Sequence, residues 1–78
     1  MQSNVYYKTS DLPEATTLKC LGHRLEDVDK TQRRAQFCFT KKADTEDILR
    51  GYRERVLMVE PYAFFQCLKE IKDRLYND

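Results

Sequence analysis

The sequence predicts a small α+β domain, in which a three-stranded sheet has helices packed on one face. Two observations lead to this fold class. Short runs of β-branched and aromatic residues alternate with apolar residues at helical spacing, and these segments follow one another in the order β-α-β-β-α-α. With 78 residues, the chain is expected to form a single domain, residues 1–78, that buries roughly 60% of the surface of its unfolded form.

The first strand and the first helix are expected near the N-terminus. Val5–Thr9 is short, β-branched and aromatic, which favours a strand. Leu12–Leu21 is expected to be a helix, because Gly22 is a natural left-handed stop after it. Its apolar residues share one broad face: Leu12, Ala15, Leu18 and Leu21.

The stretch between these two elements, "SDLPE" (residues 10–14), has the composition of a helix start. Asp11 or Ser10 can accept hydrogen bonds from the first free N–H groups, and Pro13 suits the first turn. Glu14 stands three residues after Asp11, which is the spacing of a capping box. We therefore interpret the stretch as a helix cap and not as part of an active site.

Two further strands are expected to form a hairpin. His23–Asp29 is the weaker one, and Arg33–Lys42 is strong because its apolar residues alternate with polar ones. A hairpin makes these two strands antiparallel, whereas a strand–helix–strand crossover favours parallel placement of strands one and two. Both conditions are met if strand three lies in the middle, which gives the strand order 1-3-2.

Two helices are expected in the second half. The first begins near Asp44 or Thr45, and its buried side is predicted to hold Ile48, Leu49, Tyr52 and Val56. Gly51 interrupts that helix and could let another segment pack closely against it. Val56–Val59 suits a buried turn or a short extended link before Pro61 opens the last helix. The apolar stripe of the last helix is the cleanest in the chain: Phe64, Leu68, Ile71 and Leu75.

The charge of the chain is dense but balanced. The chain has fourteen Lys and Arg residues and thirteen Asp and Glu residues, so its formal net charge is +1. Dedicated nucleic-acid or membrane binders usually have a larger excess of one sign of charge. No secretory signal is visible, and no apolar run approaches the roughly 18 residues of a membrane span. We expect a cytoplasmic protein with no contact with a membrane.

Groups that could carry chemistry are few. Cys20, Cys38 and Cys67 are far apart, form no C-x-x-C pair and are expected to be reduced, mostly buried thiols that are not activated. His23 is the one histidine. Instead of a general base or a ligand, we expect an imidazole with a structural place near the end of the first helix, where a positive charge is favoured. No zinc set, other metal site or cofactor is expected, and the chain is predicted not to be an enzyme.

An acidic cluster near the hairpin lacks the spacing of a calcium loop. Its members are followed directly by cationic residues, so we expect a solvated, salt-bridged turn. The cluster consists of Glu26, Asp27 and Asp29, and the cations are Lys30, Arg33 and Arg34.

Two sets of residues remain as candidates for binding. A basic edge could contact the phosphates of a nucleic acid if four side chains converge: Lys41, Lys42, Arg50 and Arg53. Three tyrosines expected to be partly exposed are candidates for a protein interface: Tyr6, Tyr62 and Tyr76. Phe37, Phe39 and Phe64 are expected in the core.

Four segments spread over nearly the whole chain resemble a family of small uncharacterised prokaryotic and phage proteins, known as a domain of unknown function. These are "YYKTSDL", with its Y-x-T-S-D-L pattern, "LGH", "RRAQFCF" and "YAFFQCLKEIKDRLYN", with its R-x-Y-N ending. The resemblance implies a compact α+β fold and a prokaryotic or viral setting, and it transfers no catalytic residue. The family has Asp before the helix-opening Pro, where this chain has Glu60, a poorer cap.

"YKTSDL" also resembles the opening of excisionase-like winged-helix domains, but no second helix follows closely enough to read DNA. We therefore expect a non-enzymatic protein-interaction or accessory domain of a prokaryote, phage or mobile element. The alternative is a nucleic-acid-binding accessory or regulatory protein that uses the basic edge. A protein partner is expected and a homodimer is possible, because the hairpin leaves strand edges open.

Overall fold

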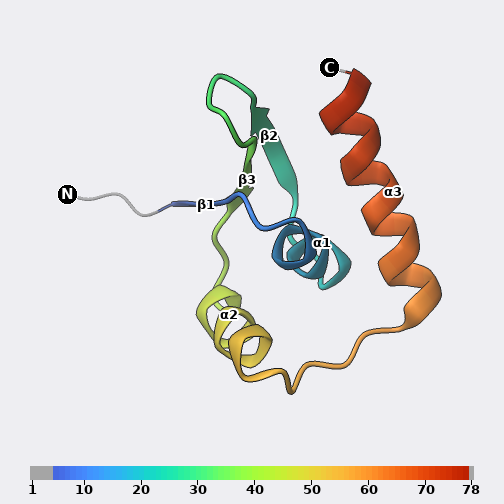
Figure 1. The fold of residues 1–78 in the computed structure, drawn as a ribbon. Coiled ribbons are helices and arrows are strands. Elements are labelled where there is room, and N and C mark those ends of the chain that lie inside the picture. Colours follow the sequence, from blue (N-terminus) through green and yellow to red (C-terminus); the bar gives the residue numbers. More distant parts are fainter. Residues whose placement is uncertain (1–4, 78) are drawn as a thin grey trace.

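The computed structural model describes residues 5–77 and contains every predicted element in the predicted order (Figure 1). The elements are β1 (Tyr6–Thr9), α1 (Leu12–Cys20), β2 (Leu25–Asp29), β3 (Gln36–Thr40), α2 (Thr45–Glu54) and α3 (Pro61–Asn77). The α+β class and the order β-α-β-β-α-α are confirmed. Among the described residues, no helix is long and apolar enough to cross a membrane.

The sheet has the predicted order β1-β3-β2, with β3 antiparallel to both neighbours. Tyr7 pairs with Phe39 and Thr9 with Phe37, and these four side chains belong to the face that the helices cover. The opposite face holds Tyr6, Lys8 and Cys38. Because both outer strands run antiparallel to β3, they are parallel to each other, as the crossover through α1 requires.

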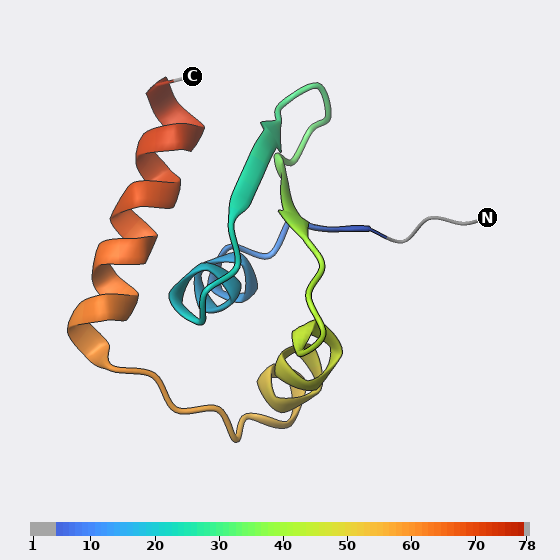
Figure 2. The same cartoon turned by 180° about the vertical axis from the view of Figure 1, so that it is seen from behind.

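Helix α1 is the central element of the helical layer. Figure 1 shows it nearly end-on between α2 and α3, and the view from behind in Figure 2 shows the same order. Five consecutive residues of α1 are buried, Glu14 to Leu18. The hydroxyl groups of Thr16 and Thr17 donate to the carbonyls of Leu12 and Pro13, each at 2.8 Å, so the burial of these threonines leaves no hydroxyl without a partner.

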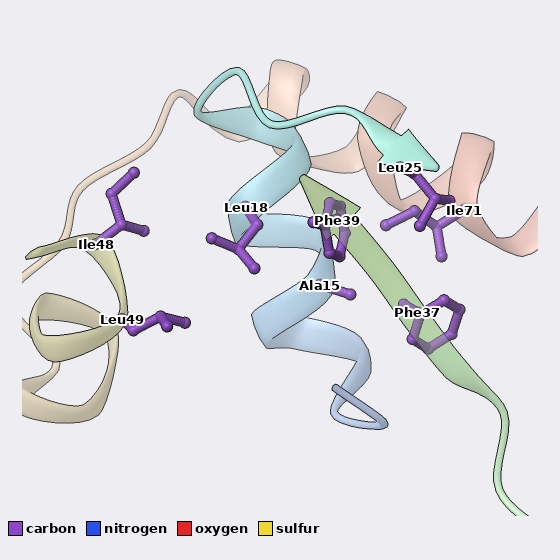
Figure 3. Close-up of a cluster of buried hydrophobic side chains, with 8 residues drawn as sticks. All are labelled: Ala15, Leu18, Leu25, Phe37, Phe39, Ile48, Leu49 and Ile71. Carbon is purple, nitrogen blue, oxygen red and sulfur yellow. The ribbon is translucent and has the colours of Figure 1, made fainter. Parts of the chain in front are cut away.

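The core joins all three helices to the sheet. Figure 3 shows Leu18 of α1 between Ile48 and Leu49 of α2 on one side and Phe39 of β3 on the other. Leu25 of β2 lies beside Ile71 of α3 in the same view. Among the described residues, the buried hydrophobic side chains are Ala15, Leu18, Leu25, Phe37, Phe39, Ile48, Leu49 and Ile71.

The boundaries of β3 differ from the prediction. It spans only Gln36–Thr40 because residues 30–35 form the connecting loop, which is longer than the predicted three-residue link. After the strand, the Lys42 amide donates to the Thr45 hydroxyl at 2.8 Å, which turns the chain into α2. Ala35, which continues the alternation in the sequence, therefore lies in the connecting loop, and the Lys42–Thr45 hydrogen bond marks the other end of the strand.

The structure corrects two predictions of buried apolar residues, one after α2 and one in α3. Val56 is 65% exposed and does not belong to the buried side of the helix, because Arg55 adopts a left-handed conformation (φ 62°) that ends it. Leu57 instead fills the space over Gly51: a Cβ there would lie 2.9 Å from Leu57 Cδ2. The expected close approach at Gly51 is thus present, while Phe64, predicted in the core, is only half-buried.

The helix caps agree with the prediction in one case and correct it in two others. Asp11 Oδ1 accepts from the Glu14 amide at 3.3 Å, so Asp11 is the cap of α1. The capping box is incomplete, because the Glu14 carboxylate accepts from the Tyr7 hydroxyl instead. Glu60 proves an effective cap for α3, since its carboxylate accepts from the amides of Tyr62 and Ala63 at 3.1 and 2.7 Å.

Candidate functional site

A polar cluster joins β1, α1 and α2 at the start of α1. The Tyr7 hydroxyl donates to Glu14 Oε1 at 2.8 Å, and the Tyr52 hydroxyl lies 3.3 Å from Asp11 Oδ2. Burial and the Glu14 carboxylate together raise the pKa of Tyr7 to about 12, although Arg53 opposes the shift. Tyr7 is therefore a neutral donor at physiological pH, and the cluster holds three elements together. The sequence reading missed it because its hydrogen bonds join residues up to 41 positions apart.

His23 is buried between the end of α1 and the start of α2. Its Nε2 atom lies 2.6 Å from the Thr45 hydroxyl and 3.8 Å from Asp44 Oδ1. Burial lowers the pKa of His23, Asp44 opposes this effect and Lys42 adds to it. The C-terminal end of a helix favours a positive charge, but here burial has the larger effect, and the site favours the neutral imidazole. With only 2% of its surface exposed, this ring connects two helices and is not open to a substrate.

The three cysteines are free thiols, each half-buried. Burial raises the pKa of Cys38 and of Cys67, and the neighbouring Cys20 raises that of Cys67 further. Both thiols are therefore protonated at neutral pH, in agreement with the expectation that neither is activated. Among residues 5–77 no group of three or more His, Cys, Asp or Glu side chains is arranged to hold a metal ion.

The acidic cluster of the hairpin is bound mainly within the hairpin itself. The Asp29 carboxylate accepts from the amide and the hydroxyl of Thr31, which lowers its pKa. Glu26 accepts from the Thr40 hydroxyl at 2.6 Å across the outer face of the sheet. Asp29 thus takes hydrogen bonds from the turn, where the sequence suggested ion pairs with the cations that follow.

The four basic candidates have intramolecular partners. Lys41 pairs with Glu46 at 3.4 Å, Arg50 pairs with Asp47, and the Lys42 ammonium donates to the carbonyl of Gly22 at 3.3 Å. Arg53 lies beside the Tyr7 hydroxyl. Acidic side chains of α2 therefore offset much of the positive field that this edge would present to a phosphate.

The three tyrosine candidates are all exposed, but they lie on different parts of the surface. Tyr6 is on the outer face of β1, whereas Tyr62 and Tyr76 are in the first and last turns of α3. Fourteen residues of helix separate the last two by roughly 21 Å. The structure does not bring the three together.

A different apolar surface was missed by the sequence reading. Four of the large exposed hydrophobic side chains fall within ten consecutive residues, and we call residues 56–65 the exposed apolar segment. They are Val56 (65% exposed), Met58 (89%), Tyr62 (69%) and Phe65 (55%). The apolar run before Pro61 was the available signal, but it was interpreted as buried or merely connecting.

Residues 4–77 match the family described as "Domain of unknown function (DUF5659)", which covers nearly the whole chain. No curated protein and no solved structure matches the chain. The chain therefore belongs to the DUF5659 family.

Proposed function

We propose that this protein is a non-enzymatic protein-interaction or accessory domain of a prokaryote, phage or mobile element, and that it acts in the cytoplasm. The observation that carries the proposal is the exposed apolar segment, with Met58 at 89% exposure at its centre. Several large apolar side chains that are exposed within a short stretch of chain favour a site of protein interaction. Free thiols suit a reducing compartment.

The composition of the segment suits a binding surface. Met58 is flexible and polarisable, so it can adapt to an irregular partner surface. Tyr62 and Phe65 lie three residues apart on α3 and therefore share one face of the helix. Aromatic side chains of this kind dominate the binding energy of many protein interfaces.

The segment is also anchored, which lowers the entropy lost when a partner binds. Leu57 and Val59 are half-buried and line a hollow with Gly51 and Tyr52, while Val56 and Met58, which alternate with them along the chain, are exposed. This alternation is that of an extended chain with one face inward. A surface held in this way needs less ordering on binding than a free loop.

The test is quantitative affinity capture from cells of the source organism, with the wild-type protein and a variant that carries Met58→Ser and Phe65→Ser. We expect a partner that the wild type retains and the variant loses. Tyr6→Ser removes an equally exposed aromatic side chain from the sheet and is the matched control. A partner lost with the control and retained by the double variant would contradict the assignment to residues 56–65.

The basic edge provides a second test. Fluorescence anisotropy with labelled duplex DNA, single-stranded DNA and RNA should show no binding at physiological salt, because the charges of Lys41 and Arg50 are offset locally. Micromolar binding that falls steeply with salt, and that is lost on substitution of Lys41, Lys42, Arg50 and Arg53, would favour the nucleic-acid function instead.

A further inference from the structure

Two adjoining hollows lie at the end of the molecule opposite the exposed apolar segment. Figure 1 shows the loop of residues 30–35 and the C-terminal end of α3 at this end, and Figure 2 agrees. The first hollow, of about 320 Å³, lies between that loop and α3, and the second, of about 230 Å³, lies between the loop and the start of α1. Ala35 and Leu75 line both, so the two hollows adjoin at these residues, and we call the two together the groove.

The groove has an apolar floor. Ala35 and Leu75 run along both hollows, and Leu12 and Phe37 complete the floor of the second. The first three are half-buried and pack against the hydrophobic core, so their positions are fixed by the fold. Such a floor suits the apolar side chains of a bound segment better than it suits a chain of phosphates.

The rim of the groove is cationic. Arg33 and Lys30 line the first hollow and Arg34 lines the second, while no acidic side chain among residues 5–77 lines either one. Arg34 Nη2 lies 3.5 Å from the carbonyl of Ser10, and the Lys30 ammonium donates to the carbonyl of Leu75 at 2.8 Å, so both side chains are placed along the rim. Asp11, the acid next to the floor in sequence, is turned toward Tyr52.

We propose that this groove binds an acidic amphipathic peptide segment of a partner protein, with the carboxylates of the segment at Arg33 and Arg34 and an apolar side chain on the floor between them. Charge complementarity decides the occupant, because guanidinium groups bind carboxylates in a bidentate manner. The groove lies apart from the exposed apolar segment, so this second site goes beyond the function proposed above.

The composition of the floor also favours a peptide over a nucleic acid as the bound ligand. Single-stranded nucleic acids are held by aromatic platforms on which bases stack, and Tyr76 is the one aromatic side chain exposed among the described residues that line the groove. A floor made largely of aliphatic groups provides apolar contact without stacking. An amphipathic peptide uses both the floor and the rim.

The experiment is fluorescence anisotropy with two labelled peptides, one that alternates Glu with Leu and Phe, and its analogue with Gln in place of every Glu. We expect the acidic peptide to bind the wild-type protein at least about tenfold more tightly than the Gln analogue. We also expect its affinity to fall at least about tenfold in the Arg33→Glu, Arg34→Glu variant. Arg33→Gln with Arg34→Gln is the milder variant, and circular dichroism confirms that each is folded.

Two control variants separate an effect of the groove from an effect of net charge and from an effect of the exposed apolar segment. Arg24→Glu with Lys72→Glu changes the net charge equally outside the groove and should bind the acidic peptide like the wild type. Met58→Ser with Phe65→Ser should also bind it normally, which separates this site from the first proposal. Equal binding of the Gln analogue, unchanged binding by the groove variants, or tighter binding of an oligonucleotide at the same arginines would each overturn the proposal.

Discussion

Helices α1 and α3 differ in how deeply they are buried, and the apolar patterns of their sequences do not predict this difference. The apolar stripe of α3 is the most regular in the chain, yet Ile71 is its one fully buried residue among those described. Helix α1 has polar residues throughout, but five consecutive residues are buried, including Glu14, Thr16 and Thr17. Periodicity predicts that a segment is helical, whereas the place of the helix in the layer decides how deeply it is buried.

The largest difference between the two helices should appear when a side chain of each is truncated. Leu18→Ala in α1 leaves a cavity next to Phe39 and Leu49 and should lower the free energy of unfolding by about 2–5 kcal/mol. Phe65→Ala in α3 removes a half-exposed ring and its contact with Lys69, so it should cost less than about 1 kcal/mol. Urea denaturation measures both, and equal costs would contradict the comparison.

The pH dependence of stability tests the junction after α1. Because burial lowers the pKa of His23 below its unfolded value of 6.5, its contribution to stability is fully present above pH 6.5. The contribution is lost as the pH falls from 6.5 toward the folded-state pKa, at up to about 1.4 kcal/mol per pH unit.

Urea denaturation at a series of pH values between about 6.5 and 5 measures this slope, above the range in which most carboxylates titrate. His23→Gln should flatten it, whatever that substitution does to stability at neutral pH. An unchanged slope in His23→Gln would show that another group is responsible.

The caps should have smaller effects that distinguish neighbouring residues. Asp11→Ala removes the acceptor for the Glu14 amide and should cost about 0.5–2 kcal/mol. Ser10→Ala should cost much less, since Asp11 is the observed cap. Thermal denaturation of both variants checks this order, and a larger loss for Ser10→Ala would mean that the helix begins one residue earlier.

Gly51→Ala should change the free energy of unfolding least, because a gain in helix propensity and a steric clash with Leu57 oppose each other. Alanine favours the interior of α2 by up to about 1 kcal/mol, but its Cβ would lie 2.9 Å from Leu57 Cδ2. In a Leu57→Ala background the steric clash disappears, so the same substitution should then be clearly stabilising. A double-mutant cycle measures this coupling, and additive effects would show that Leu57 does not occupy the site.

Much of the fold could be predicted from local patterns. The alternation around Phe37 and Phe39 indicates β3, and Asp11 and Pro61 mark two helix starts. The strand order follows from the handedness of crossovers together with the hairpin, and neither needs knowledge of side-chain contacts.

Other features depend on contacts between residues that are distant in sequence. The neutral state of His23 follows from its burial against Thr45, twenty-two positions away. The Glu14 carboxylate accepts a hydrogen bond from Tyr7 and therefore does not complete the capping box. The exposure of Val56 and Met58 follows from the left-handed turn at Arg55, a residue with no compositional signal for it. The candidate surfaces were therefore the part of the molecule that patterns alone predicted least well.

The most direct test is native-state hydrogen exchange resolved by residue. It measures whether the central position of α1 in the helical layer makes its amides better protected than those of α3. We predict that the interior amides of α1, around Leu18, exchange only when the whole protein unfolds. The amides in the first two turns of α3, around Phe65, should exchange through local opening at a lower free energy. Equal protection of the two helices, or stronger protection of α3, would contradict the account and make the regular stripe of α3 the better guide to burial.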